Sequence, residues 1–190
     1  MPFLAAAWFA VAVVVVIVGF IAVATYNDVV ALIQRIDKAW ANIDVALKQR
    51  HDELPNLVAA VRDVMGFEQA VLEEVSRLRN AYDPDHSVPE QGALSAETSQ
   101  AVRSLFAVVE NYPALRSANN VLELQAEIER LEGVIADRRE LYNDQVYRYN
   151  TRVTQLPAVL LAGPFGWARR DFFATGDQDR ARPDVSLRTA

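Results

Sequence analysis

The sequence predicts an all-α protein in which one N-terminal transmembrane helix is followed by a four-helix up-and-down bundle. Residues 3–24 carry no charged side chain, which predicts the transmembrane helix. Apolar residues recur at three- and four-residue steps along most of the remaining chain, which is the period of amphipathic helices. The seven Gly and eight Pro lie mostly in loops and in the C-terminal part, so long stretches are free to be helical.

The N-terminal apolar segment is long enough to span a bilayer, because at ~1.5 Å per residue it would cross a hydrocarbon core of about 30 Å. Trp8 and Tyr26 lie near its two ends, where aromatic rings prefer the headgroup level. No basic residue precedes the segment, which favours a retained anchor over a cleaved secretory signal, although Ala22 and Ala24 resemble a cleavage site. We therefore expect residues 1–26 to anchor a single-pass protein in the cell membrane.

The orientation of the chain is predicted from the Lys and Arg residues near the anchor. All of them follow the apolar segment, beginning with Arg35 and Lys38, and none precedes it. Because positively charged flanks stay on the cytoplasmic side, we expect the soluble domain to be cytoplasmic.

Residues 39–61 form the segment around which we expect the bundle to be built. Their apolar residues follow one helical face, and Arg50 lies in the middle of that face. Pro55 falls inside the pattern, where it removes a backbone N–H and clashes with the preceding turn. We expect the chain to reverse there, since about 27 residues on each side would form helices of ~40 Å that cover one another. The alternative is one kinked helix from the membrane to Tyr82, whose apolar faces would need other subunits to cover them.

The remaining helices of the bundle are predicted from periodicity and turn signals. We expect the first at residues 27–52 and the second from the region of Pro55 to Tyr82. A loop of turn formers at residues 83–92 then precedes a third helix with Ser95 as its N-cap. The fourth helix is the longest, at residues 117–156.

These boundaries divide the chain into four parts. The anchor at residues 1–26 is followed by the bundle domain at residues 27–156. Residues 175–190 are polar and without pattern, so we expect a disordered tail. Residues 157–174 combine aromatic and basic side chains suited to the membrane boundary and to anionic lipid, and a cap on the open end of the bundle is an equal alternative. The residues proposed for this membrane contact are Phe165, Trp167, Arg169, Arg170, Phe172 and Phe173.

Six polar residues lie on or beside the apolar faces: Arg50, Glu68, Gln125, Arg138, Asn143 and Asn150. An unpaired buried charge costs several kcal/mol, so we expect these residues to form a structural polar core of ion pairs and hydrogen bonds. The first acids to consider as partners of the two arginines are Glu68, Glu127 and Asp44. The alternative is a catalytic or ligand site, because charged groups with shifted pKa values cluster in such places.

Two Tyr-Asn pairs, Tyr142-Asn143 and Tyr149-Asn150, are two helical turns apart and repeat on one face. The rings are expected to pack in the core with hydrogen-bonded hydroxyls. The alternative is that both pairs contact a partner helix.

Composition and missing motifs exclude several classes of function. The net charge of −6 provides no basic surface for nucleic acid, and the absence of cysteine excludes disulfides and Cys-based metal sites. His51, Asp52 and Glu53 are consecutive and cannot converge on one metal ion. There is no G-x-S-x-G, H-E-x-x-H or Gly-rich phosphate loop. We therefore expect no catalytic residues, no metal and no cofactor.

A series of short motifs runs along the chain: Tyr26-Asn27, Ala39-Trp40, Ile43-Asp44-Val45, Leu47-Lys48, Arg50, Leu54-Pro55-Asn56-Leu57-Val58, Tyr112-Pro113-Ala114-Leu115, Leu124-Gln125-x-Glu127, Ile135, Arg138-Arg139, Tyr142-Asn143, Tyr149-Asn150 and Phe165-Gly166. In their order and spacing, these motifs resemble the LemA family of bacterial membrane-anchored proteins. The resemblance implies a bundle of four main helices, a single membrane pass and no assigned enzymatic activity. One branch of the family is associated with building magnetosome membranes. This chain departs from the pattern in its Pro-rich loop at residues 83–92 and in its polar tail.

The leading functional hypothesis is a non-enzymatic, membrane-tethered helical scaffold that acts through protein contacts, by self-assembly or by shaping the membrane. Its partners would be the lipid bilayer, further copies of the chain and unidentified proteins, but not nucleic acid. The sequence leaves two alternatives open: an adaptor or sensor in an envelope stress response, and an enzyme that uses the buried arginines and acids.

Overall fold

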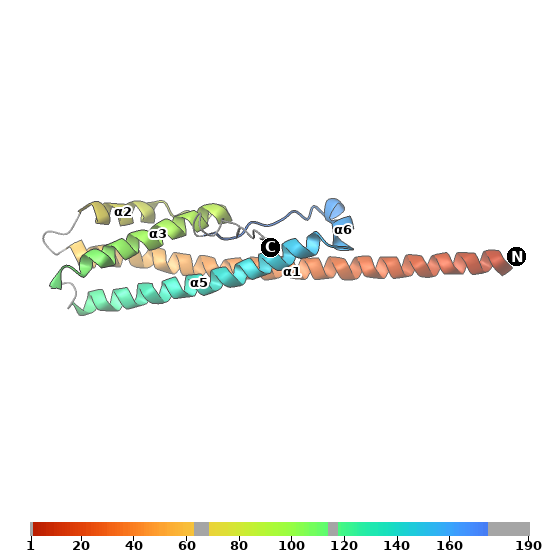
Figure 1. Cartoon of the computed structure of the whole chain (residues 1–190), viewed down its shortest axis with the longest axis horizontal. Coiled ribbons are helices and arrows are strands. Elements are labelled where there is room, and N and C mark those ends of the chain that lie inside the picture. Colours follow the sequence, from red (N-terminus) through yellow and green to blue (C-terminus); the bar gives the residue numbers. More distant parts are fainter. Residues whose placement is uncertain (1, 63–68, 114–117, 175–190) are drawn as a thin grey trace, which may run out of the picture. The chain divides into compact units, whose positions relative to one another are not determined.

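The computed structural model describes residues 2–62, 69–113 and 118–174, and the regular secondary structure of these residues is entirely helical, with no strand. The helices are α1 (Pro2–Arg62), α2 (Gln69–Asn80), α3 (Val88–Val109), α5 (Asn119–Val153) and α6 (Ala158–Phe165) (Figure 1). The all-α class with an N-terminal apolar helix is therefore confirmed. Glu68 and the expected disordered tail at residues 175–190 lie outside the described residues.

The chain divides into two units, and both α1 and α5 contribute to each of them. The first, here the anchor unit, consists of Met1–Trp40 and Leu141–Asp171. The second, here the bundle unit, consists of the described parts of Ala41–Glu140 and Phe172–Ala190. Each unit has its own buried apolar residues, so each is described separately below.

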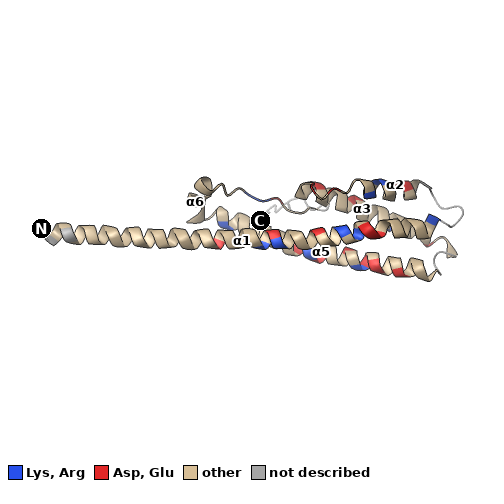
Figure 2. Cartoon of the chain, turned by 180° about the vertical axis from the view of Figure 1, so that it is seen from behind, with Lys and Arg blue, Asp and Glu red and all other residues tan. Residues whose placement is uncertain are grey.

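In the anchor unit, α1 and α5 pack against each other in antiparallel directions. The ring of Trp40 lies 5.7 Å from that of Tyr142, and Arg152 donates to Asp28 at 2.6 Å near the other end of the contact. The apolar face between these two contacts is buried: it comprises Val29, Leu32, Ile36, Val146, Tyr149 and Val153. Before this face, the described side chains of residues 3–24 of α1 are exposed except for the half-buried Ala22, and the segment carries no charge (Figure 2).

The chain does not reverse at Pro55, because α1 continues through it to Arg62. The predicted reversal is therefore wrong, and so are the expected end of the first helix near residue 52 and a single helix reaching Tyr82. An interior proline costs a helix about 3 kcal/mol. Burying one Leu or Val side chain contributes roughly 1.5–3 kcal/mol, and Leu54, Leu57 and Val61 are all buried around the proline. Packing against distant parts of the chain thus offsets the local penalty.

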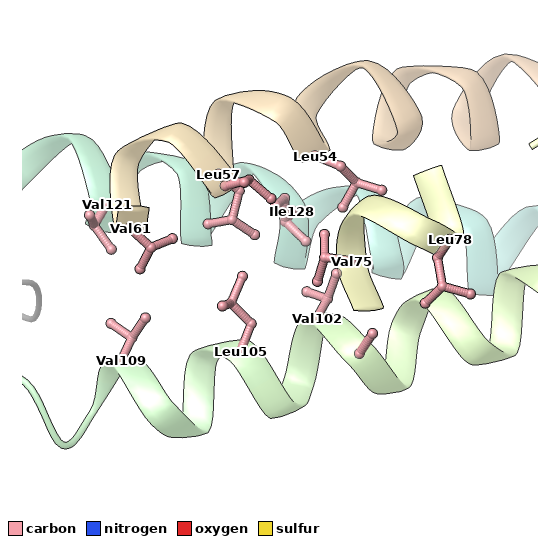
Figure 3. Close-up of a cluster of buried hydrophobic side chains, with 12 residues drawn as sticks. Leu54, Leu57, Val61, Val75, Leu78, Val102, Leu105, Val109, Val121 and Ile128 are labelled. Atoms are coloured by element: carbon pink, nitrogen blue, oxygen red, sulfur yellow. The ribbon is translucent and has the colours of Figure 1, made fainter. Parts of the chain in front are cut away.

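In the bundle unit, the end of α1 packs with α2, α3 and the beginning of α5 around one apolar core. Leu57 of α1, Val75 of α2, Leu105 of α3 and Ile128 of α5 are buried in the same cluster (Figure 3). The helix α2 runs back along α1, since the hydroxyl of Tyr82 beyond its end donates to Asp44 at 3.3 Å. This core holds the polar side chains of α1, α3 and α5 in fixed positions.

The third helix begins earlier than the sequence analysis expected. Its N-cap is Ser87, whose backbone N–H and hydroxyl both donate to one carboxylate oxygen of Glu90, at 2.8 and 2.6 Å. In an S-x-x-E capping box, the glutamate side chain accepts a hydrogen bond from the backbone N–H of the N-cap residue, as Glu90 does here. Pro89 in the first turn also favours the start of a helix. Ser95, predicted as the N-cap, is instead buried inside α3. The connection before α3 is therefore shorter than the predicted loop.

Candidate functional site

A buried polar cluster, here the Arg50 centre, lies in the bundle unit where α1, α3 and α5 meet. It consists of Arg50, Ser95, Ser99 and Glu132. The Arg50 side chain is only 4% exposed, and its Nη1 lies 2.7 Å from Oε1 of Glu132. The same guanidinium donates to the hydroxyl oxygens of Ser99 at 2.9 Å and Ser95 at 3.1 Å. Ser99 in turn donates to the other oxygen of Glu132 at 2.6 Å.

The hydrogen bonds of the Arg50 centre link three helices: Arg50 lies on α1, Ser95 and Ser99 on α3, and Glu132 on α5. The positive charge of Arg50 is balanced by one carboxylate, and both carboxylate oxygens accept short hydrogen bonds. A serine nucleophile needs a neighbouring base that is free to take its proton. The carboxylate beside Ser99 is already engaged by the guanidinium, so this arrangement favours fixing helix register over nucleophilic chemistry.

A small cavity adjoins the Arg50 centre and contains about 20 Å³, which is room for about one water molecule. His51 and Tyr82 line it, with their ring centroids 4.7 Å apart. Burial lowers the pKa of His51. Burial, together with the negative charge of Asp44, raises the pKa of Tyr82 to about 12. Both rings are therefore favoured in their neutral forms, and the cavity is too small for a substrate.

The acid that pairs with Arg50 differs from those proposed from the sequence. Glu127 forms an exposed ion pair with Arg130 at 2.6 Å. Asp44 accepts the hydrogen bond from Tyr82. The partner is Glu132, which lies four residues after the buried Ile128 and so at the edge of the apolar face of α5. Its position at the edge of the apolar face could have identified Glu132 from the sequence as a candidate partner of Arg50.

The other polar residues on the predicted faces make separate contacts. Arg138 is half-buried and donates to the backbone carbonyl oxygen of Asn42 at 2.5 Å. Gln125 is half-buried and donates to Glu129 at 3.0 Å along α5. Asn143 is half-buried on α5. The structure therefore does not gather these three residues around Arg50.

Three members of the two Tyr-Asn pairs of α5, Tyr142, Tyr149 and Asn150, bind the chain's own C-terminal segment within the anchor unit. We call residues 167–171 the C-terminal strap. Tyr149 donates to the carbonyl oxygen of Ala168 at 3.0 Å, and Tyr142 donates to that of Asp171 at 3.1 Å. Both rings are buried. The two rings are therefore buried with hydrogen-bonded hydroxyls, as expected from the sequence.

The side chain of Asn150 pairs with the backbone of Arg170 in both directions. Its amide donates to the Arg170 carbonyl oxygen, and its own oxygen accepts from the Arg170 N–H, each at 2.9 Å. The strap is thus held through backbone atoms, which side-chain patterns in the sequence do not reveal. Its Arg169 and Arg170 are exposed.

A tight turn brings the strap next to the end of the apolar part of α1. Gly166 ends α6 with φ 66°, a left-handed conformation that glycine adopts without steric cost. Its N–H donates to Gly163 at 3.1 Å, and the N–H of Trp167 donates to Ala162 at 2.9 Å, as in a Schellman motif. Trp167 then stacks on Phe165 at 5.2 Å.

Tyr26 lies against both rings, 5.0 Å from Phe165 and 6.0 Å from Trp167. The ring that was predicted to mark the membrane end of the anchor therefore meets the segment that was predicted to contact lipid. Trp8, near the other end of the anchor, is 73% exposed.

The structure separates the last two residues proposed for lipid contact. Phe172 is exposed, but Phe173 is fully buried in the bundle unit, so a lipid contact is wrong for Phe173. In the same unit, the backbone of Ala174 lies directly against Gly92. Phe173 and Ala174 thus belong to the packing of the bundle unit.

Comparison with known proteins identifies the chain's relatives. The sequence profile of the LemA family matches residues 39–187. The magnetosome proteins MamQ 2 and MamQ 1 of Paramagnetospirillum magneticum are each 25% identical to the chain over 185 residues, covering 83% of this chain and 68% of theirs. The magnetosome protein MamQ of Magnetospirillum gryphiswaldense is 22% identical over 189 residues, covering 84% and 70%. Because the profile matches well over half of the sequence, the chain belongs to the LemA family.

Proposed function

We propose that this protein is a single-pass, non-enzymatic scaffold that holds a helical domain at the membrane and acts through protein contacts. Its family and its long apolar helix indicate a membrane-associated helical protein. The observation that carries the proposal is the continuity of α1 from Pro2 to Arg62. One helix supplies the uncovered apolar segment and the buried side chains of both units, so anchor and domain are joined without a linker.

A non-enzymatic role is supported by the chemistry of the Arg50 centre. Its guanidinium and carboxylate neutralise each other, and the neighbouring cavity has room for about one water molecule. Among the described residues, no three His, Asp or Glu side chains gather where a metal ion could bind. The polar residues that an enzyme would use are here engaged in holding helices together.

The magnetosome names of the relatives are compatible with a role in organising a membrane compartment. For this chain we propose that the domain lies on the cytoplasmic side, since the basic residues follow the anchor. Its partners would be further copies of the chain or other membrane-associated proteins.

Photo-crosslinking in native membranes tests the scaffold directly. A photoreactive amino acid is placed in the full chain at Leu122 on α5, which is 46% exposed, and at Tyr147, which is 63% exposed. The matched control is Leu131, which is fully buried. We expect discrete protein adducts from an exposed position and none from Leu131. A scan of exposed positions that yields no protein adduct would contradict a scaffold.

The enzymatic alternative is tested with the double variant Arg50→Met/Glu132→Gln, provided that it keeps its helical content. A scaffold predicts that the same adducts form, because the surface is unchanged. If a cellular phenotype of the deletion strain is restored by the native chain but not by this folded double variant, the Arg50 centre has a chemical role and the proposal is wrong.

A further inference from the structure

The helix α6 in the anchor unit exposes apolar side chains that the described part of the chain does not cover. Leu160 is 70% exposed and Phe165 is 50% exposed, and Leu156, just before the helix, is 71% exposed. Val159 is also exposed. We call these four residues the α6 patch. Such a run of uncovered apolar residues is typical of an interaction surface.

The α6 patch lies at the level where the anchor ends. Phe165 contacts Tyr26, which is two residues beyond the uncharged residues 3–24. The ion pair between Asp28 and Arg152 at 2.6 Å holds the last turn of α5 at the same level, just before α6 begins. Two independent contacts therefore place the patch beside the point at which α1 would leave the membrane (Figure 1).

The chemistry around the patch matches a lipid headgroup boundary. Tyr26 and Trp167 are the ring types that are enriched at this depth. Arg169 of the strap, two residues after Trp167, is exposed, and basic side chains at this depth attract anionic lipid headgroups. The helix itself is too short to span a bilayer, and its sequence AVLLAGPF carries no charge. An element of this kind can lie in the boundary but cannot cross it.

We propose that α6 is a second membrane contact, which inserts the α6 patch into the headgroup boundary of the bilayer that residues 3–24 span. The inference rests on the proposed anchoring by α1. The occupant of the patch is the lipid surface, because the patch is continuous with the end of the anchor. The domain would then be held to the membrane at two points, and the strap would be fixed between the second point and α5.

Spin labelling of the full chain tests this proposal, and the absence of native cysteine makes each introduced cysteine unique. Leu160→Cys carries the label on the patch, and because Leu160 is mostly exposed the substitution removes little packing. The matched control is Leu141→Cys, which is 50% exposed on α5 and about 18 Å along the helix from Val153. Val15→Cys reports on the anchor itself. The protein is reconstituted in vesicles of phosphatidylcholine and phosphatidylglycerol.

The readout is the collision rate of each label with oxygen, which concentrates in lipid, and with a nickel chelate, which stays in water. We expect the labels at positions 15 and 160 to lose accessibility to the chelate, while the label at position 141 keeps it. If position 15 is protected but position 160 is as accessible to the chelate as position 141, the second contact is refuted and the anchor stands. If position 15 is accessible to the chelate, the anchor is refuted as well.

Three further measurements serve as controls. A label at Leu156→Cys, also on the patch, should show the same protection as the label at position 160. If position 160 is protected in native membranes but not in vesicles of lipid alone, a protein covers α6 and the proposal is wrong. Unchanged circular dichroism of each labelled chain confirms that the comparison is made on folded protein.

Discussion

Removing the charge of Glu132 should destabilise the protein more than removing Arg50, although the two residues form one ion pair. The asymmetry follows from exposure, since the side chain of Arg50 is 4% exposed and that of Glu132 is 30% exposed. Glu132→Gln leaves a positive charge buried without a counterion. Arg50→Met leaves a carboxylate that reaches water and still accepts from Ser99.

The magnitudes can be estimated from these contacts. Breaking a buried pair costs about 3–5 kcal/mol, and two serine hydroxyls remain to solvate Arg50, so we expect about 3 kcal/mol for Glu132→Gln. Arg50→Met should cost only about 1 kcal/mol, because the three hydrogen bonds of the guanidinium are lost but the desolvation cost of burying its charge is removed as well. Since 1 kcal/mol shifts Tm by roughly 2–4 °C in a protein of this size, the expected decreases are about 6–12 °C and 2–4 °C. The double variant should be close to Arg50→Met, because no buried charge remains.

The assay is thermal unfolding of the full chain in detergent micelles, followed by circular dichroism. The control is Glu74→Gln, which removes one member of the exposed ion pair with Arg77 and should leave Tm unchanged. Equal decreases for Glu132→Gln and Arg50→Met would refute the reasoning from exposure. No decrease for Glu132→Gln would mean that the guanidinium is not buried.

Three further perturbations test the packing, the strap and the cavity. Gly92→Ala should destabilise the protein by about 1–3 kcal/mol, because the added Cβ would collide with the backbone of Ala174. Gly133→Ala places its Cβ in open space and should stabilise the protein by up to about 1 kcal/mol. Denaturant unfolding measures both changes. Asn150→Ala should raise the hydrogen-exchange rate of the Arg170 amide, and an unchanged rate would show that the strap is not held there. The free energy of unfolding should fall as pH rises from 10.0 towards 12, because the phenol of Tyr82 loses its proton at a lower pH in the unfolded chain than in the folded one. Tyr82→Phe should reduce this pH dependence. An equal pH dependence in the native chain and in Tyr82→Phe would contradict the raised pKa.

The sequence predicted those features whose cause is local. The uncharged N-terminal segment and the long apolar face of α5 follow from composition and period, and α5 begins and ends within about three residues of the expected bounds. The first residue of α3 could also have been predicted from the sequence. Ser87 and Glu90 have the three-residue spacing of a capping box, whereas Ser95 and Glu97 are only two residues apart.

Features that depend on distant residues were not predictable in the same way. Continuity through Pro55 results from burial against α2, α3 and α5, which a local pattern does not include. The pairing of Arg50 with Glu132 joins residues separated by 82 positions. The strap is bound through backbone carbonyls and an N–H, so the identity of its side chains gave no indication of where it would dock.

In the anchor unit, the C-terminal segment docks at the point where α1 changes from an uncharged apolar helix to an amphipathic helix. Up to Ala24 the helix is apolar on every side, and from Val29 it buries only one face, while Asp28 stays exposed. Under the proposed anchoring, α1 leaves hydrocarbon at this point, where aromatic and polar contacts are favoured. Tyr26 and Asp28 supply them, and each is met by a residue of the C-terminal part, Phe165 and Arg152. The residues that follow the uncharged segment of α1 therefore also form the docking site for α6 and the strap. The position of the α6 patch along α1 is thus determined by the sequence of α1.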